Sequence, residues 1–288
     1  MKERIAALKR FFVEEKGHHA CRQPAQDAYA LARAFAQEQL PPLERSIRRH
    51  LYVLQAERPV VFADERIAFT RTVTVLPELY TPQELEALRG RYWLHEQGEV
   101  CNINVDYTML MGCGFDAKRA QLLELAQRHG QAGETDAAYY LRAQERLLAA
   151  VQALADAYAA EAEKTGNESV SAVLSHVPAK PPRTFHEALQ MLRILHYVMW
   201  CGHNYHNTLG RFDQYMFPYL KADMDSGLLD REGALELLEE FFLSCNRDSD
   251  LYTGMQQGDN GQSLVLGDLV VDFCLKFRAY HQKHNTLF

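Results

Sequence analysis

The stretch YHNTLGRFDQY at residues 205–215 decides the fold of this chain, together with one motif on either side of it. Upstream, residues 177–190 read VPAKPPRTFHEALQ, a short proline-rich connector that leads into a helix start. Thr184 and Glu187 have the spacing of a capping box, in which each side chain binds the other residue's backbone amide. Downstream, residues 259–267 read DNGQSLVLG, and their apolar run predicts a short buried strand.

The segment that follows the capping box is apolar on nearly every side of a helix. Its apolar residues are Leu189, Leu192, Ile194, Leu195, Val198 and Met199. A helix without a polar face is buried on all sides in a folded protein. The sequence therefore predicts a central buried helix that ends near the glycine at position 202.

Helical periodicity dominates the residues before this region. Helix starts are predicted at residue 42, at residue 82 behind Thr81, and at residue 116. The longest predicted helix covers about residues 136–164 and ends at Gly166. Residues 60–62 and 67–75 are rich in β-branched side chains and predict strands.

Composition limits the classes of function. The chain has 288 residues, 47% of them hydrophobic and 24% charged, with a net charge of −7, which fits a globular core and excludes a basic nucleic-acid surface. Its six cysteines are scattered without a C-x-x-C pair, which favours free thiols in a reducing compartment. No apolar run is long enough to span a bilayer. We expect a cytoplasmic protein that binds neither nucleic acid nor membrane.

Four adjacent polar side chains precede Gly210. Tyr205, His206, Asn207 and Thr208 offer a phenol, an imidazole, an amide and a hydroxyl. Small-molecule pockets place a few convergent polar groups on an apolar wall. Tyr205, His206 and Asn207 supply groups of this kind, and the family resemblance given below implies that they line the substrate pocket.

Two other interpretations of this region were weighed. Cys201, His203 and His206 include metal-ligand residue types, but their spacing matches no standard zinc motif, so histidines satisfied by hydrogen bonds are the alternative. Arg211 and Asp213 stand two residues apart beside a glycine, which favours a structural ion pair in a turn over a catalytic pair.

These three motifs resemble the glycyl-radical enzymes of the pyruvate formate-lyase and glycerol dehydratase type. The resemblance implies a helix-rich α/β fold in which two half-barrels are wrapped by helices. It implies that residues 1–288 form one domain, incomplete at its C-terminus. Residues 1–176 would be the mainly helical part, and residues 177–288 the start of the barrel core.

A second, weaker resemblance covers residues 98–107, GEVCNINVDY. It is similar to the family stretch Gly-His-x-x-Pro-Asp-Tyr, with Asn102 nearest the histidine position and Val105 at the proline. An amide cannot transfer protons near neutral pH as an imidazole does. The resemblance therefore implies only a hydrogen-bonding role for Asn102 in the substrate pocket. Counting back from Gly210, the His-Ser pair of dehydratase members falls on Tyr205 and His206.

The resemblance also implies the chemistry. In the family, a backbone glycyl radical is relayed to an active-site cysteine, and a partner enzyme installs it with S-adenosylmethionine and an iron–sulfur cluster. Neither the cysteine motif nor the glycine motif occurs in this sequence. We therefore expect no catalytic residue, no directly bound cofactor and no metal in this chain.

The implied function is that of the N-terminal portion of a lyase or dehydratase that cleaves a C–C or carbon–heteroatom bond. The expected partners are a small-molecule substrate and the radical-activating enzyme, with homo-oligomerisation possible. The chain alone is expected to be inactive. The alternative is a non-enzymatic remnant, or a helical scaffold that binds a full-length relative.

Overall fold

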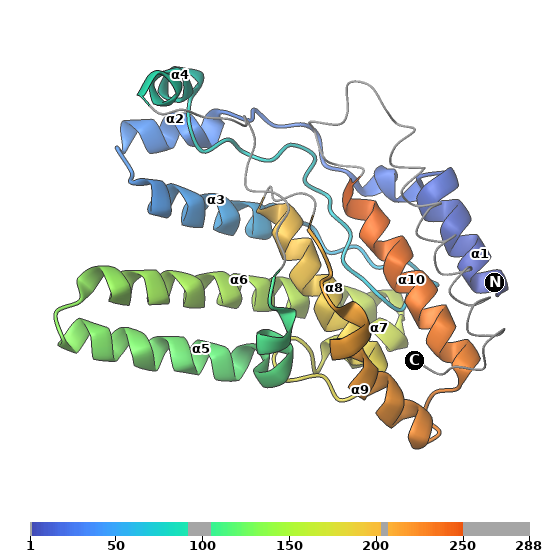
Figure 1. The fold of residues 1–288 in the computed structure, drawn as a ribbon. Coiled ribbons are helices and arrows are strands. Elements are labelled where there is room, and N and C mark those ends of the chain that lie inside the picture. The colour runs from blue at the N-terminus through green and yellow to red at the C-terminus, as the bar shows by residue number, and fades with distance from the viewer. Residues whose placement is uncertain (1, 92–104, 203–206, 250–288) are drawn as a thin grey trace.

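The computed structural model describes residues 2–91, 105–202 and 207–249, and the chain is mainly helical within them (Figure 1). The helices are α1 (Glu3–Lys9), the π-helical turn η1 (Arg10–Glu14), the 3₁₀ helix η2 (Gly17–Cys21), α2 (Ala30–Gln37), α3 (Pro42–Ala56), α4 (Pro82–Arg91), α5 (Tyr107–Gln131), α6 (Thr135–Thr165), α7 (Glu168–Leu174), α8 (Phe185–Cys201), α9 (Phe212–Asp225) and α10 (Arg231–Ser249). The helix-rich prediction is confirmed. The strand predicted at residues 264–266 lies outside the described residues.

Helix α8 forms the centre of the fold. It contacts α3, α5, α7, α9 and α10, and Leu189, Leu192 and Ile194 on it are fully buried. Burial of apolar area on this scale is the main stabilising contribution to folding. The predicted buried helix is confirmed.

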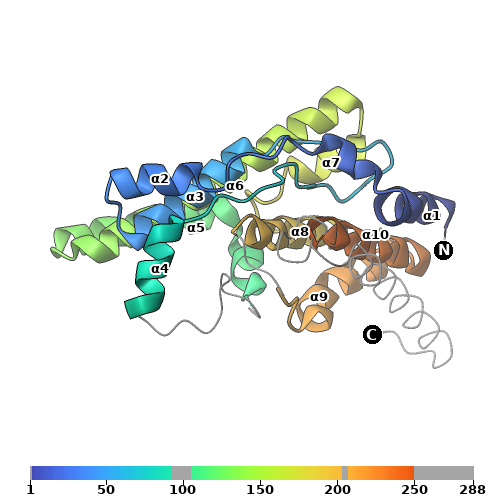
Figure 2. The same cartoon turned by 90° about the horizontal axis from the view of Figure 1, so that it is seen from above.

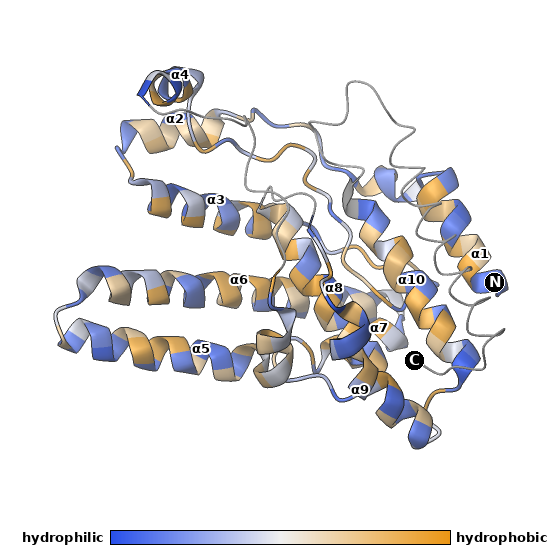
Figure 3. Ribbon diagram, viewed as in Figure 1, coloured by the Kyte–Doolittle hydropathy of each residue, from blue (hydrophilic) through white to orange (hydrophobic). Residues whose placement is uncertain are grey.

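The other helices pack on two sides of this centre. Helices α5 and α6 lie side by side as an antiparallel hairpin that extends away from α8, and α1 lies beside α10 (Figures 1 and 2). Hydrophobic and hydrophilic residues alternate along α5 and α6 (Figure 3), as expected for helices with one buried face. None of the helices in the described ranges combines the length and the apolar character needed to cross a membrane.

The predicted helix boundaries rest on local hydrogen bonds. The amide of Glu84 donates to Thr81 Oγ1 at 3.2 Å, and the amide of Glu187 donates to Thr184 Oγ1 at 3.1 Å. Helix α6 ends at Gly166, whose φ of +75° places it in the left-handed region. These caps confirm the predicted starts of α4 and α8 and the predicted end of α6.

The strands predicted at residues 60–62 and 67–75 are wrong. The described ranges contain no run of strand, only an isolated bridge residue at Thr208. Residues 65–73 form a largely extended and buried segment, broken by bends at Arg66 and Ile67 and by a φ of +86° at Phe69, and helix side chains bind its backbone groups. Ala68 N donates to Gln190 Oε1 at 2.9 Å, and Thr70 N and O both pair with the Tyr158 hydroxyl, at 3.0 and 2.9 Å.

Arginines bind the carbonyls of the same extended segment. Arg193 donates to Phe69 O at 2.6 Å, and Arg247 donates to Ile67 O at 2.8 Å. A buried backbone group without a partner costs free energy comparable to a lost hydrogen bond. The helices around the segment therefore replace the neighbouring strand of a sheet.

Helix α5 is broken near the position at which the sequence predicted that it begins. The predicted start was residue 116, but the helix begins at Tyr107 and is interrupted at Gly114, where φ is +74°. The amides of Phe115 and Asp116, just after the break, donate to Pro178 O and to the next carbonyl at 2.9 and 3.0 Å. The proline-rich connector thus caps the second half of α5.

Candidate functional site

The candidate site is a pocket between the start of α5 and the turn that precedes α9. Its volume is about 270 Å³, and its lining residues are Val105, Asp106, Tyr107, Thr108, Leu209, Gly210, Arg211 and Tyr215. Val105, Asp106 and Tyr107 belong to the weaker family stretch, Thr108 follows it directly, and the last four belong to the motif at residues 205–215. Two segments about a hundred residues apart in sequence therefore meet at this pocket.

Asp106 shapes the α5 side of the pocket. Its side chain accepts a hydrogen bond from the Thr108 amide at 3.1 Å and caps the helix. The hydrogen bond from the Thr108 hydroxyl holds the pKa of Asp106 below its usual range. Asp106 is therefore an anion at neutral pH, and its charge lies at the positive end of the helix dipole.

Two tyrosines join the two segments. The Tyr107 hydroxyl donates to Thr208 O at 3.1 Å, and the Tyr215 hydroxyl donates to Leu209 O at 2.7 Å. Their ring centroids are 6.3 Å apart, with the planes tilted by 38°. Burial, with the nearby Cys245, raises the pKa of Tyr107 to about 12, and burial also raises the pKa of Tyr215. Both hydroxyls remain protonated donors at neutral pH.

The turn before α9 lies on the opposite side of the pocket. Gly210 has a φ of +60°, a conformation that favours glycine. Arg211 Nε lies 3.7 Å from Asp213 Oδ1, and the two side chains are 71% and 62% exposed. An exposed pair of this kind contributes little to stability. It forms part of the turn and not of a buried catalytic centre.

The residues upstream of the pocket are also fixed. Helix α8 ends at Cys201, and the buried Arg49 of α3 donates from Nη2 to Gly202 O at 3.0 Å. A cation at the C-terminal end of a helix is stabilised by the helix dipole. Arg49 thus fixes the backbone just before residue 203.

Of the predicted pocket residues, the structure describes one. Asn207 is half-buried and stands directly before Thr208, whose carbonyl Tyr107 binds. Tyr205, His206 and Asn102 lie outside the described residues. The described ends of both predicted segments reach the same pocket, but Asn207 is not among the residues that line it, and the pocket role of all four side chains stays a prediction.

The metal interpretation is only partly within the described residues. Cys201 is buried, whereas His203 and His206 lie outside the described ranges. Among the residues that are described, no group of three or more His, Cys, Asp or Glu side chains could hold a metal ion. No ligand set for a metal can therefore be assembled from this part of the chain.

Sequence reasoning missed the two tyrosines as site residues. Tyr107 is the last residue of the weaker family stretch, and Tyr215 is the last residue of the motif at residues 205–215. The available signal was that each is a tyrosine and not a phenylalanine at a buried place, because a buried phenol needs a hydrogen-bond acceptor. That acceptor lies about a hundred residues away in the case of Tyr107 and is not visible in sequence.

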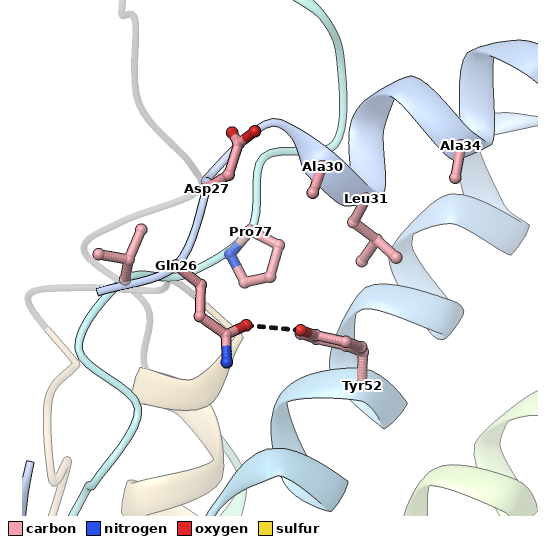
Figure 4. Close-up of a pocket in the computed structure, with 8 residues that line it drawn as sticks. Gln26, Asp27, Ala30, Leu31, Ala34, Tyr52 and Pro77 are labelled. Atoms are coloured by element: carbon pink, nitrogen blue, oxygen red, sulfur yellow. Dashed lines mark hydrogen bonds between the residues drawn. The ribbon is translucent and has the colours of Figure 1, made fainter. Parts of the chain in front are cut away.

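A larger pocket of about 510 Å³ lies between α2, α3 and the extended chain near Pro77 (Figure 4). Its lining residues are Gln26, Asp27, Ala30, Leu31, Ala34, Tyr52, Val75 and Pro77. The Tyr52 hydroxyl donates to Gln26 Oε1 at 2.7 Å, and Asp27 is paired with Arg33. Its polar groups bind one another or a neighbouring residue, and its lining includes no residue of the stretches at residues 98–107 and 205–215.

Comparison with protein families gives one matching family. A family model described as pyruvate formate lyase-like matches residues 62–268. Among curated proteins, the (2S)-3-sulfopropanediol dehydratase of Klebsiella oxytoca is 27% identical over 186 residues, which are 58% of this chain and 22% of that protein. The trans-4-hydroxy-L-proline dehydratase of Clostridioides difficile is 35% identical over 88 residues, which are 30% of this chain and 11% of that protein.

Solved structures have the same fold. The glycerol-bound form of the B12-independent glycerol dehydratase from Clostridium butyricum has a TM-score of 0.66 at 17% identity. A glycyl radical enzyme from Archaeoglobus fulgidus has a TM-score of 0.65 at 18% identity. The matches cover 86% and 85% of this chain but 40% of each solved chain. The chain thus spans less than half the length of these relatives.

Proposed function

Because this chain belongs to the pyruvate formate lyase-like family, we propose that it forms the N-terminal portion of a glycyl radical dehydratase or lyase. In this proposal the complete protein cleaves a C–C or carbon–heteroatom bond in a small molecule. The curated relatives include dehydratases, a sulfite-lyase and a decarboxylase subunit, which supports this reaction class.

One observation carries the proposal. The stretches at residues 98–107 and 205–215, which contain the predicted pocket residues, both contribute other residues to the lining of one pocket and are joined by the hydrogen bond from Tyr107 to Thr208 O at 3.1 Å. An accidental resemblance in two short stretches would give no reason for them to meet in space. In the proposal, Tyr205, His206, Asn207 and Asn102 supply the polar wall of this pocket.

The proposed substrate class is a small, hydroxylated polar molecule. Relatives are named for sulfopropanediol, hydroxyproline, glycerol and propanediol. An amide such as that of Asn207 can both donate to a hydroxyl group and accept from one. A site built to hydrogen-bond a hydroxyl discriminates strongly against analogues that lack it.

The radical chemistry is assigned to no residue of this chain. The relatives are glycyl radical enzymes, but the sequence contains neither the cysteine nor the glycine motif of that chemistry. In the proposal, an activating enzyme with S-adenosylmethionine and an iron–sulfur cluster acts on the complete protein, in the cytoplasm. The 288-residue chain alone then binds substrate without turning it over.

Ligand binding to the purified chain tests the proposal. With glycerol and trans-4-hydroxy-L-proline as probes in saturation-transfer NMR, we expect weak binding by the parent chain. Asn207→Ala should lower the affinity at least about fivefold, the effect of losing one hydrogen bond. The control is Gln26→Ala, which removes an amide from the larger pocket and should leave the affinity unchanged.

Three outcomes would contradict the proposal. If neither probe binds, the assignment of a substrate pocket is wrong. If Gln26→Ala loses binding, the probes bind in the larger pocket. Product formed anaerobically by the chain with an activating enzyme would refute the inactivity of the chain. Binding to a full-length relative without probe binding would favour the scaffold alternative.

A further inference from the structure

Two neighbouring backbone carbonyls beside the pocket are held by tyrosine hydroxyls from two different helices. Thr208 O is bound by Tyr107 of α5 at 3.1 Å, and Leu209 O is bound by Tyr215 of α9 at 2.7 Å. Thr208 and Leu209 lie outside the helices, and Thr208 belongs to an isolated bridge. The two tyrosines therefore add helix-borne hydrogen bonds to a segment that is not itself helical.

Both donors are themselves rigidly held. The Tyr107 side chain is 2% exposed and belongs to the main hydrophobic core, and the Tyr215 ring packs against Phe212 at 6.0 Å. Phe212 in turn stacks on Phe241 of α10 at 5.6 Å. A hydrogen bond from a donor fixed by packing restricts its acceptor more than one from a mobile side chain does. The positions of Thr208 and Leu209 are therefore set by the helix core.

Asn207 is one peptide unit upstream of the first of these carbonyls. Consecutive Cα atoms are about 3.8 Å apart across a trans peptide, so the backbone of Asn207 follows that of Thr208. On the other side of this turn, the positive φ of Gly210 redirects the chain into α9. The direction in which the Asn207 side chain leaves the backbone thus depends on the two tyrosine hydrogen bonds.

We propose that Tyr107 and Tyr215 are positioning residues of the pocket, whose hydroxyls fix Asn207 through the Thr208 and Leu209 carbonyls. This inference rests on the proposed function for the meaning of the pocket. The claim that the two tyrosines fix the backbone of Asn207 does not rest on the proposed function, because it concerns only hydrogen bonds within the chain. The donor role requires protonated hydroxyls, and burial keeps both pKa values raised.

Backbone dynamics of Asn207 test the inference without any substrate. The chain is labelled with ¹⁵N-asparagine, and the Asn207 amide signal is assigned by its loss in Asn207→Ser. We expect an order parameter near about 0.85 in the parent chain and below about 0.6 in the double variant Tyr107→Phe/Tyr215→Phe. Phenylalanine keeps the ring packing and removes only the hydroxyl. The single variants should give intermediate values and keep the test available if the double variant does not fold.

Two controls show whether a change in the order parameter is specific to Asn207 and to the two tyrosine hydroxyls. Asn167, whose side chain binds Phe62 O and Glu65 O at 3.0 and 2.8 Å, reports on general loosening and should stay unchanged. Tyr219→Phe removes a half-buried hydroxyl from α9 that bonds to no described residue, and it should leave Asn207 rigid. A flexible Asn207 in the parent, an unchanged value in the variants, or an equal fall at Asn167 would overturn the inference.

Probe binding separates this inference from the proposed function. In Tyr107→Phe and Tyr215→Phe, the affinity for glycerol should fall about threefold to tenfold if a mobile Asn207 must be ordered on binding. If Asn207 loosens but affinity is unchanged, the positioning is right and the assignment of the pocket to substrate is wrong.

Discussion

At Gly114, neighbouring backbone atoms leave no room for a side chain. Its φ is +74°, and a Cβ atom there would lie 2.6 Å from Ala179 O and 2.7 Å from Lys180 C. The close approach allows the following amides of α5 to reach the carbonyls of the proline-rich connector. Gly112, two residues earlier, has nothing within 4 Å of such a Cβ.

Alanine substitution at these two glycines should therefore give opposite results. Gly114→Ala is expected to lower the free energy of unfolding by more than about 2 kcal/mol, from backbone strain and from the contact with backbone atoms. Gly112→Ala, at an exposed helical position, should be neutral or stabilise by up to about 1 kcal/mol. Urea denaturation followed by circular dichroism measures both, and equal effects would refute the argument.

The helices of this chain could be predicted from its sequence because their signals are local. The spacings of Thr81 to Glu84 and of Thr184 to Glu187 predict helix starts, and Gly166 predicts a helix end, without reference to the rest of the chain. The β-branched residues at 67–75 predicted a strand, but the structure has no strand there. Several of the hydrogen-bond partners of this segment belong to helices more than eighty residues away, as Tyr158 does for Thr70, and no local pattern predicts them.

For the candidate site, too, the local signals could be predicted from the sequence and the contacts between distant residues could not. The motifs at residues 98–107 and 205–215 pointed to the two segments that meet at the pocket, because each motif consists of residues that are adjacent in the sequence. The hydrogen bond from Tyr107 to Thr208 O joins residues 101 positions apart, and no spacing rule predicts it. The break of α5 at Gly114 was missed for a related reason, because its cause is the connector at Pro178.

Removing one hydroxyl should measure how strongly a helix holds the extended segment. Tyr158 of α6 is fully buried, and its hydroxyl both accepts from Thr70 N and donates to Thr70 O. In Tyr158→Phe, two buried backbone groups lose their partner, which should cost about 1–3 kcal/mol of unfolding free energy. Tyr140→Phe on the same helix, at a position 49% exposed, is the control and should change stability by less than about 0.5 kcal/mol. A loss no larger than that of the control in urea denaturation would contradict this account.

On the scale of the whole molecule, the two ends of the described chain pack together. Arg4 at the start of α1 binds Glu236 at 2.6 Å and Glu240 at 2.8 Å, both on α10. Nearby, Arg247 of α10 pairs with Glu65 at 2.8 Å and lies over the Phe12 ring, 4.4 Å from its centroid. Charged and apolar contacts together therefore close the fold across more than 180 residues.

The pair of Glu65 and Arg247 should make global stability depend on pH. Burial raises the pKa of Glu65 from 4.5 to about 7, although Arg247 opposes the shift. Between these two values the folded chain binds more protons than the unfolded chain, so stability falls as the pH rises. The loss from this group is up to about 3 kcal/mol, complete above about pH 7.

Glu65→Gln removes this contribution. Near pH 5 the variant is expected to be about as stable as the parent, because the folded parent also carries a neutral side chain at this position. Its stability should fall less steeply between pH 4.5 and 7, as measured by urea denaturation at several pH values. Glu163→Gln, at an exposed site on α6, should follow the parent curve. Parallel curves for the parent and Glu65→Gln would contradict the assignment.

The packing of α1 against α10 also has a consequence for synthesis on the ribosome. Translation adds about 5–20 residues per second, so α10 leaves the ribosome roughly 10–50 seconds after α1. During that interval Ile5 and Leu8, which are buried in the finished fold, lack the neighbours that cover them. The nascent N-terminus therefore presents an apolar surface to chaperones until nearly all of the described chain has been made.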